Sequence, residues 1–141
     1  MSDDPIESPP QRSTVSAFPV RPRLLVVDDE PLILEGLSRL LATRDYEVET
    51  AGGGYEALLA IGRQQFDAIL LDLGMPDLDG SEVLRFVTER SADTPVIVVS
   101  GDSTIDAAIR ALRGGAADFV RKPYEPEELL RRVDNTLTRR R

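Results

Sequence analysis

Three carboxylates directly follow two strongly apolar runs of the sequence. Asp28 and Asp29 come after Leu24–Val27, and Asp72 comes after Ala68–Leu71. Continuous apolar runs of this length are typical of strands that are buried on both faces of a parallel sheet. Ligands of such sheets bind beyond the carboxyl ends of the strands, so we expect the three carboxylates to meet at one edge.

Two further polar groups follow the remaining apolar runs. Ser100 comes after Val96–Val99, and Lys122 comes after Phe119 and Val120. The predicted edge therefore gathers three carboxylates, a hydroxyl and an ammonium group. Each of them alone has an ordinary explanation, such as a helix N-terminal acid or a surface lysine. Their shared placement at the ends of four strands favours a functional site.

The composition restricts the chemistry of such a site. The sequence contains no histidine and no cysteine, which removes the commonest general base and the usual zinc ligands. Carboxylates about 4 Å apart repel one another by roughly 4 kcal/mol per pair at an effective dielectric constant near 20, so the cluster needs a cation. Mg²⁺ suits carboxylate oxygens and bridges proteins to phosphate groups. A carboxylate can also carry a phosphoryl group as an aspartyl phosphate.

The apolar runs alternate with helical patterns along the chain. Glu47–Ala51 alternates in polarity, which predicts a fifth strand at the edge of the sheet. Five strands alternating with five helices predict an α/β fold, a doubly wound parallel sheet of order 2-1-3-4-5 that is flavodoxin-like. The first helix is expected to end near Arg44. The apolar positions that mark the helices are Leu32, Ile33, Leu37, Leu40 and Leu41; Ala57, Leu58 and Ile61; Val83, Leu84 and Val87; Ile105, Ala108, Ile109 and Leu112; and Leu129, Leu130, Val133 and Leu137.

Glycine and aspartate residues mark the expected turns. Gly114 and Gly115 predict the end of the fourth helix. Asp77 and Asp79 are interpreted as turn and capping residues before the third helix. The run Gly52–Gly54 lacks the lysine of a phosphate-binding loop, so it is interpreted as a flexible turn into the second helix.

Four motifs follow one another along the chain: VVDDE (Val26–Glu30), LDLGMPDLDG (Leu71–Gly80), VVSG (Val98–Gly101) and GGAADFVRKP (Gly114–Pro123). Together they resemble the receiver domain of two-component response regulators. The resemblance extends over about residues 22–138.

These limits divide the chain into one domain and two ends. We expect residues 22–138 to form the receiver domain. Residues 1–21 are rich in proline, serine and charge, which predicts a disordered N-terminal arm. Residues 139–141 are expected to be a basic C-terminal end or the start of a linker.

The resemblance implies a role for each acidic residue. Asp72 is the phosphoryl acceptor of the family pattern and contributes to a Mg²⁺ site. Asp29 binds the metal directly, and Asp28 acts mainly through water. The backbone carbonyl of Gly74 completes the protein's share of the coordination.

The resemblance also assigns the groups around the phosphoryl site. Lys122 binds the phosphoryl group, and the peptide bond between Lys122 and Pro123 is expected to be cis. Ser100 and Phe119 correspond to the hydroxyl and aromatic residues of the family's switch. Phosphorylation draws the hydroxyl toward the phosphoryl group and turns the aromatic ring inward.

The function implied is a Mg²⁺-dependent, phosphorylation-controlled signalling switch. A partner histidine kinase or phosphotransfer protein would supply the phosphoryl group. Self-phosphorylation and self-dephosphorylation would be weak at most, so the domain is not expected to be an enzyme. Partner binding would change on the face formed by the fourth helix, the fifth strand and the last helix, where a homodimer is also expected. A single-domain regulator and a receiver that controls an output domain in a longer chain both stay open.

Two alternatives use the same residues differently. A pseudo-receiver would act only as an interaction module, but such domains usually lose an acid or the lysine, and both are present here. A phosphatase that forms an aspartyl phosphate would carry a second aspartate two residues after the nucleophile. Asp28 is instead followed by Asp29 and Glu30, so the spacing disfavours that enzyme.

The charge distribution narrows the range of partners. The net charge is −8, although five arginines lie in the last eleven residues. An acidic body argues against direct binding to nucleic acid. No apolar run approaches the roughly 20 residues of a membrane span, and the acidic N-terminus is unlike a secretory signal. The sequence therefore predicts a cytoplasmic protein without membrane contact.

Overall fold

Five parallel strands form the centre of this computed structural model, which describes residues 21–102 and 104–139. The order β2-β1-β3-β4-β5 confirms the prediction, and β2 lies at an edge as expected. Nearly all of the predicted arm, together with Arg140 and Arg141, lies outside the described residues. The strands are β1 (Arg23–Val27), β2 (Glu47–Ala51), β3 (Ala68–Leu71), β4 (Val96–Ser100) and β5 (Asp118–Arg121).

Within the described residues, five helices connect and follow the strands. Their number confirms the prediction, and the first of them ends two residues before the expected Arg44. None of the helices in the described parts of the chain is long and apolar enough to cross a membrane. The helices are α2 (Pro31–Ala42), α3 (Gly54–Arg63), α4 (Gly80–Arg90), α5 (Ile105–Arg113) and α6 (Pro126–Arg139).

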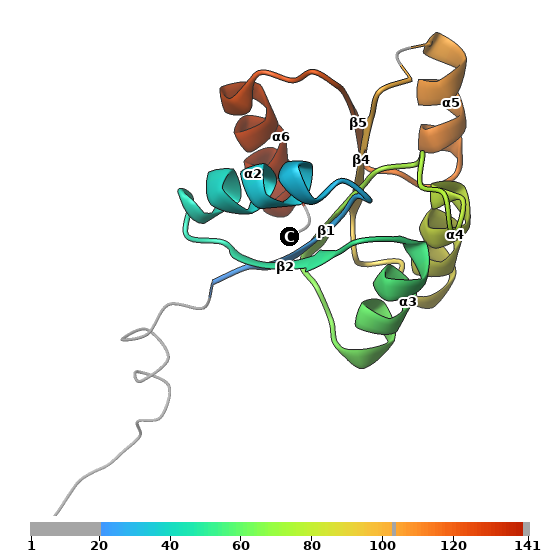
Figure 1. Ribbon diagram of the computed structural model, residues 1–141, viewed down its shortest axis with the longest axis horizontal. Helices are drawn as coiled ribbons and strands as arrows, with labels where there is room; N and C mark the ends of the chain where they lie inside the picture. Colours follow the sequence, from blue (N-terminus) through green and yellow to red (C-terminus); the bar gives the residue numbers. More distant parts are fainter. Residues whose placement is uncertain (1–20, 103, 140–141) are drawn as a thin grey trace, which may run out of the picture.

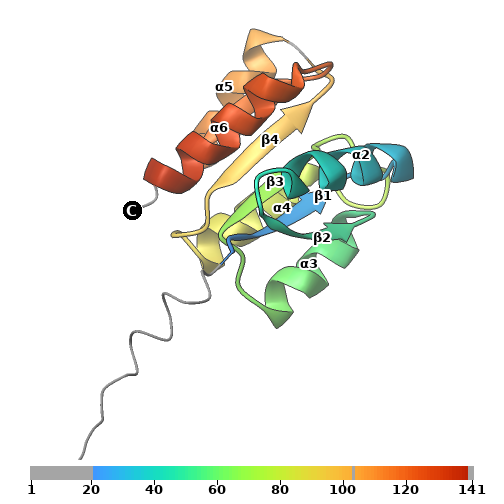
Figure 2. The ribbon, with the colours of Figure 1, turned by 90° about the vertical axis from the view of Figure 1, so that its left-hand side faces the viewer.

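The helices cover both faces of the sheet (Figures 1 and 2). Successive strand side chains point to opposite faces, so each strand contributes to two hydrophobic cores. Leu24 and Val26 of β1 pack in the core with α2 and α6. Leu25 and Val27 pack in the core with α3, α4 and α5. All four side chains are almost fully buried, as the continuous apolar run predicted.

The first turn of α2 differs from the expected packing. Leu32 was predicted to share the apolar face of this helix, but its side chain is 80% exposed. Leu37 and Leu41 are the buried positions of α2. Leu32 precedes Leu37 by five residues, which places it about 140° away around the helix. The apolar side chain of Leu32 therefore lies on the surface.

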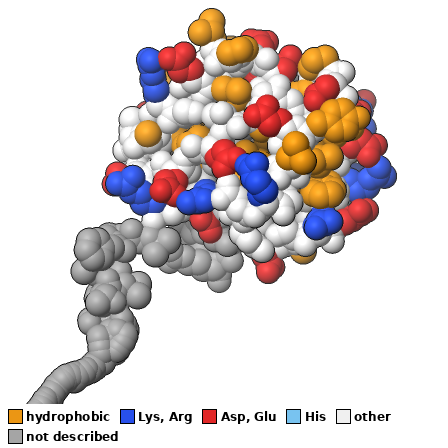
Figure 3. Space-filling model, turned by 60° about the horizontal axis from the view of Figure 1, so that its bottom comes forward, with side chains coloured by type: hydrophobic (Ala, Val, Ile, Leu, Met, Phe, Trp, Pro, Cys, Tyr) orange, Lys and Arg blue, Asp and Glu red, His pale blue; other side chains and the backbone are white. Residues whose placement is uncertain are grey.

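Helix α5 also presents its large apolar residues to solvent. Ile105 is 76% exposed and Leu112 is 48% exposed, while the buried positions of this helix are Ala107 and Ala111. The helix thus packs on the sheet through alanine and leaves an apolar surface. Figure 3 shows a face of the molecule on which charges of both signs are interspersed and hydrophobic side chains gather on one side. Among the described residues, the exposed large hydrophobic ones are Leu32, Tyr55, Leu59, Ile105, Ile109 and Leu112.

The glycine and aspartate turns follow the sequence in part. Helix α5 ends at Arg113 with Gly114 as its C-cap, and Gly115 has a φ of 111°, which confirms the predicted end. Asp79 caps α4 by accepting a hydrogen bond from Ser81 N at 3.0 Å, as expected. The side chain of Asp77 does not cap α4. It lies instead against the N-terminus of α3, because the loop before α4 crosses that helix end.

Candidate functional site

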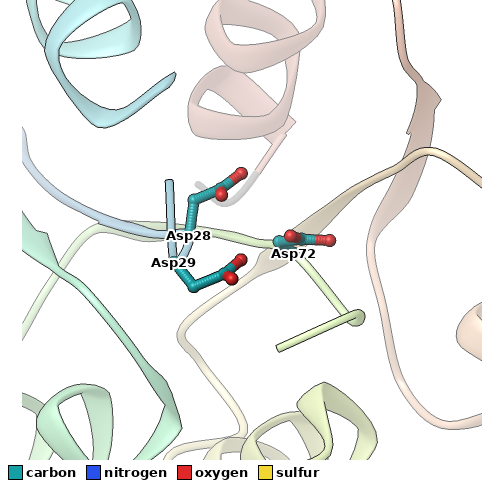
Figure 4. Close-up of side chains that lie close together, drawn as sticks. All are labelled: Asp28, Asp29 and Asp72. Atoms are coloured by element: carbon teal, nitrogen blue, oxygen red, sulfur yellow. The ribbon is translucent and has the colours of Figure 1, made fainter. Parts of the chain in front are cut away.

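The carboxyl ends of β1 and β3 lie side by side. Val27 pairs with Leu71 in the parallel register, and Asp72 N donates a hydrogen bond to Val27 O at 3.0 Å. Asp28 and Asp72 therefore follow the ends of neighbouring strands at equivalent positions. Oxygen atoms from the carboxylates of Asp28, Asp29 and Asp72 lie within 4.8 Å of one another. Figure 4 shows these carboxylates gathered beyond the strand ends.

Two of the three carboxylates are buried. The exposed fraction is 2% for Asp28 and 9% for Asp72, and Asp29 is more exposed. One oxygen of each buried carboxylate is held by the backbone that follows it. Asp28 Oδ1 accepts a hydrogen bond from Glu30 N at 3.0 Å, and Asp72 Oδ1 accepts one from Gly74 N at 3.1 Å.

Lys122 is the only lysine in the sequence, and it lies at this cluster. Its Nζ is 2.9 Å from Asp28 Oδ2 and 3.6 Å from Asp72 Oδ2. Burial by itself would lower the pKa of Lys122. The hydrogen bond to Asp28 and the charges of Asp72, Asp28 and Glu30 outweigh burial, so the pKa is raised. The ammonium group is therefore charged near neutral pH.

The charges of the cluster fit a divalent cation. Three carboxylates and one ammonium leave a net charge of about −2 if all are ionised. The donors are hard oxygen atoms close enough to share one ion, which suits Mg²⁺ better than a softer metal. The described residues therefore fit the predicted magnesium site, with Asp28, Asp29 and Asp72 as its candidate ligands.

Ser100 ends β4 close to Lys122 in the sheet. Lys122 N donates a hydrogen bond to Ser100 O at 2.8 Å, and Ser100 Oγ accepts one from Asp102 N at 3.1 Å. The serine is 5% exposed. A groove of about 580 Å³ opens beside it, between α4 and α5, with Leu73 and Gly74 in its wall. Ser100 therefore lies in the wall of this groove, at the end of the strand next to β3.

Phe119 lies on the same face of the sheet as Ser100. It pairs with Val98 of the neighbouring strand, and Ser100 follows Val98 by two residues. The phenyl ring is partly buried and packs against the core beneath α3, α4 and α5. The peptide bond between Lys122 and Pro123 is cis, which confirms that prediction. Asp28, Asp29, Asp72 and Lys122 thus lie together at one edge of the sheet, and Ser100 ends the strand between β3 and β5.

The model of the response regulator receiver domain matches residues 24–134. This chain belongs to the receiver domain family. The family consists of phosphoryl-accepting signalling domains, and the acidic cluster is of the kind typical of their Mg²⁺ sites. Histidine kinases are the partners that the family implies.

Curated relatives of this receiver domain include longer proteins. The chain is 39% identical over 117 residues to the response regulator MprA of Mycobacterium leprae, covering 83% of this chain and 51% of that protein. It is 42% identical over 119 residues to the transcriptional regulatory protein PrrA of Mycobacterium tuberculosis, covering 84% and 51%. This chain therefore spans about half the length of these relatives.

Solved structures share the fold closely. A receiver domain protein from Methanospirillum hungatei superposes with a TM-score of 0.82 at 30% identity, covering 86% of this chain and 97% of that one. The beryllofluoride-activated receiver domain of DrrB gives a TM-score of 0.78 at 31% identity, covering 84% and 99%. Both comparisons extend over nearly the whole described domain.

The sequence analysis assigned Asp77 to the wrong helix. Asp77 contacts the N-terminus of α3 through two hydrogen bonds, although it belongs to the loop that follows Asp72. A signal was present in the sequence, because the N-cap Gly53 and the first helical residue Gly54 have no side chain to cap α3. A helix start without a capping side chain requires an acceptor from elsewhere.

Proposed function

We propose that Asp72 accepts a phosphoryl group from a phosphohistidine of a partner histidine kinase or phosphotransfer protein. The observation that carries this proposal is the cluster of Asp28, Asp29 and Asp72 with Lys122 at its edge. Asp72 sits at the centre of the sheet edge, within reach of a cation on one side and of the ammonium on the other. Its 9% exposure leaves the carboxylate accessible to a donor.

The transfer is a displacement at phosphorus. A carboxylate oxygen of Asp72 forms a new P–O bond as the P–N bond to the donor imidazole breaks. The imidazole leaves with the bonding electron pair and takes up a proton. The carboxylates of the cluster and the Gly74 carbonyl would hold Mg²⁺, which supplies charge neutralisation for the phosphoryl oxygens.

Lys122 and Ser100 complete the surroundings of the phosphoryl group. The ammonium of Lys122 already lies 3.6 Å from Asp72 Oδ2, so it is positioned to attract a phosphoryl oxygen. Ser100 Oγ accepts one hydrogen bond, from Asp102 N, and its own proton is available to donate. Such preorganised positive charge and donors lower the barrier to phosphoryl transfer.

Phosphorylation would act on partners through Ser100 and Phe119. A hydroxyl drawn toward the phosphoryl group would vacate space on the face that Phe119 shares, and the ring would turn inward. The face made by α5, β5 and α6 would then change its shape and its partners. This is a local change of charge that biases a two-state element.

The activated domain would act through a second copy of itself or through an output domain. The apolar residues Ile105, Ile109 and Leu112 of α5 are exposed, which supports contact with a second copy of the domain after phosphorylation. The curated relatives are about twice as long as the matched region. This length supports a receiver that controls an output domain.

Intact-mass spectrometry after incubation with acetyl phosphate tests the proposal. The wild type should gain one phosphoryl group in Mg²⁺ and none in EDTA, and Asp72→Asn should gain none in either. Beryllofluoride binding, followed by NMR, covers the case in which the domain does not use a small donor. A wild-type protein that neither gains the phosphoryl group nor binds beryllofluoride would be a pseudo-receiver, contrary to the proposal.

A further inference from the structure

Helix α3 has no side-chain cap from its own N-terminal residues. The first N–H groups of a helix have no partner within the helix and need other acceptors. The carboxylate of Asp77 supplies acceptors for two of them. Its oxygen atoms accept hydrogen bonds from Gly54 N at 3.0 Å and from Tyr55 N at 3.2 Å. Asp77 belongs to the loop between β3 and α4. The loop that begins at Asp72 is thus bound to the end of a different helix.

The contact between this loop and α3 leaves no space for a side chain at Gly53 or Gly54. A Cβ at Gly53 would lie 2.8 Å from Asp77 Oδ2, and a Cβ at Gly54 would lie 2.5 Å from Leu78 Cβ. The two hydrogen bonds are also the main reason that the pKa of Asp77 is lowered. The run of glycines forms the turn into α3 that the sequence predicts, but the loop packs against two of its members, Gly53 and Gly54.

The other parts of the loop are fixed near Asp72. Gly74 N donates a hydrogen bond to Asp72 Oδ1 at 3.1 Å, and Gly80 N donates one to Leu73 O at 3.1 Å. Nothing comparable packs on Gly74 itself. Apart from its chain neighbours, only Asp72 Oδ1 comes within 4 Å of a Cβ placed there. The orientation of the Gly74 carbonyl therefore depends on the anchors on either side of it. Two anchors follow it: Met75, which is 7% exposed in the core beneath α3, α4 and α5, and Asp77, which binds the end of α3.

We propose that Asp77 is a positioning residue for the phosphoryl-acceptor site, which it serves by holding the loop with Asp72 and the Gly74 carbonyl against the N-terminus of α3. This inference rests on the proposed function of Asp72. It makes α3 part of the site although no side chain of α3 belongs to the acidic cluster. Because coupling between two sites is reciprocal, a cation bound by the loop also strengthens the cap on α3.

Magnesium affinity of the folded protein, measured by isothermal titration calorimetry, tests the proposal. Asp77→Ala should weaken Mg²⁺ binding about fivefold or more, the lower end of typical couplings between sites. Gly53→Ala should weaken it as well, because the added methyl group displaces the Asp77 carboxylate while α3 keeps an allowed, extended φ of −176° at that residue. Asp77→Asn keeps one oxygen acceptor and should give an intermediate affinity.

A variant with substitutions at both Gly53 and Asp77 distinguishes loss of this contact from a general loss of stability. In the absence of the Asp77 carboxylate, a methyl group at position 53 has nothing to displace. Gly53→Ala combined with Asp77→Ala should therefore bind Mg²⁺ no more weakly than Asp77→Ala alone. Val48→Ala is the matched control, because it removes a partly buried side chain from the edge strand β2, away from the loop. It should lower stability and leave Mg²⁺ affinity unchanged.

Amide hydrogen exchange of the metal-free protein gives a second readout. The Gly54 and Tyr55 amides should exchange faster in Asp77→Ala than in wild type, and Mg²⁺ should slow them in wild type only. Faster exchange with unchanged Mg²⁺ affinity would make Asp77 a helix cap alone and overturn the inference while the proposed function stands. A wild type that binds neither Mg²⁺ nor beryllofluoride would overturn both.

Discussion

Lys122 Nζ donates a hydrogen bond of 2.9 Å to Asp28 Oδ2, although 94 residues separate the two in the sequence. Asp28 follows β1 and Lys122 follows β5. These strands are not neighbours, because β3 and β4 lie between them. The lysine side chain therefore reaches back across the centre of the sheet edge, past Asp72. Its ammonium compensates a carboxylate whose side chain is only 3% exposed.

Lys122→Met should destabilise the metal-free protein. Asp28 loses its charged partner while it stays buried beside two other carboxylates, which costs about 1–3 kcal/mol. Urea unfolding in EDTA measures this loss. Addition of Mg²⁺ should restore part of it, because a bound cation takes over the compensation of charge. A deficit of the same size in EDTA and in saturating Mg²⁺ would mean that the lysine contributes by packing instead of charge.

The acidic cluster could be predicted from the sequence because its geometry follows from the sheet. Parallel strands end at a common edge, so residues that directly follow Val27 and Leu71 must lie close together. The continuous apolar runs also identified the buried strands, and the alternating run of β2 identified the edge. These inferences depend on backbone periodicity, which the sequence carries locally.

The contacts that the sequence did not predict depend on how loops and helices meet. Asp77 looked like a cap for the helix that follows it, and only the path of the loop brings it to α3. The helical pattern of α5 was correct, but its large residues lie outside and Ala107 and Ala111 lie inside. A pattern gives the period of an amphipathic helix. It does not say which of two apolar sides faces the sheet.

Gly80→Ala should disturb the loop that carries Asp72. A Cβ at this position would lie 2.4 Å from Leu73 Cα and 2.7 Å from Asp72 O, so the backbone itself must move. We expect a loss of stability of about 1–3 kcal/mol, as for other overpacked sites. Chemical denaturation measures it.

Gly36→Ala is the matched control for this change. Gly36 lies within α2, and nothing lies within 4 Å of an added Cβ. Alanine should stabilise the helix by about 0.5–1 kcal/mol. Equal effects of the two substitutions would show that the close approach at Gly80 is not a constraint on the fold.

Tyr46 should make stability fall at alkaline pH. The pKa of Tyr46 is raised above its usual range. Burial makes the largest contribution, and the hydrogen bond to Asp134 and the charge of that carboxylate add to it. Above pH of about 10 the unfolded chain releases the phenol proton while the folded chain keeps it. The unfolded state then binds fewer protons, so the free energy of unfolding decreases as pH rises.

Tyr46→Phe removes this dependence. The stability difference between wild type and Tyr46→Phe should be constant from neutral pH to about pH 9 and should shrink above about pH 10. Urea unfolding at several pH values measures it. A difference that stays constant across pH 10 would mean that Tyr46 ionises as readily in the folded protein as in the unfolded chain.

Ile109→Glu should prevent self-association of the activated domain. Ile109 lies on the exposed apolar side of α5, between Ile105 and Leu112. A charge at the centre of that surface would have to be desolvated in a dimer that forms through it. Sedimentation with Mg²⁺ and beryllofluoride should show a wild-type dimer and a monomeric Ile109→Glu. Leu59→Glu is the control, because Leu59 is 69% exposed on α3, outside the face made by α5, β5 and α6. Dimers that persist in Ile109→Glu and disappear in Leu59→Glu would move the contact surface from α5 to α3.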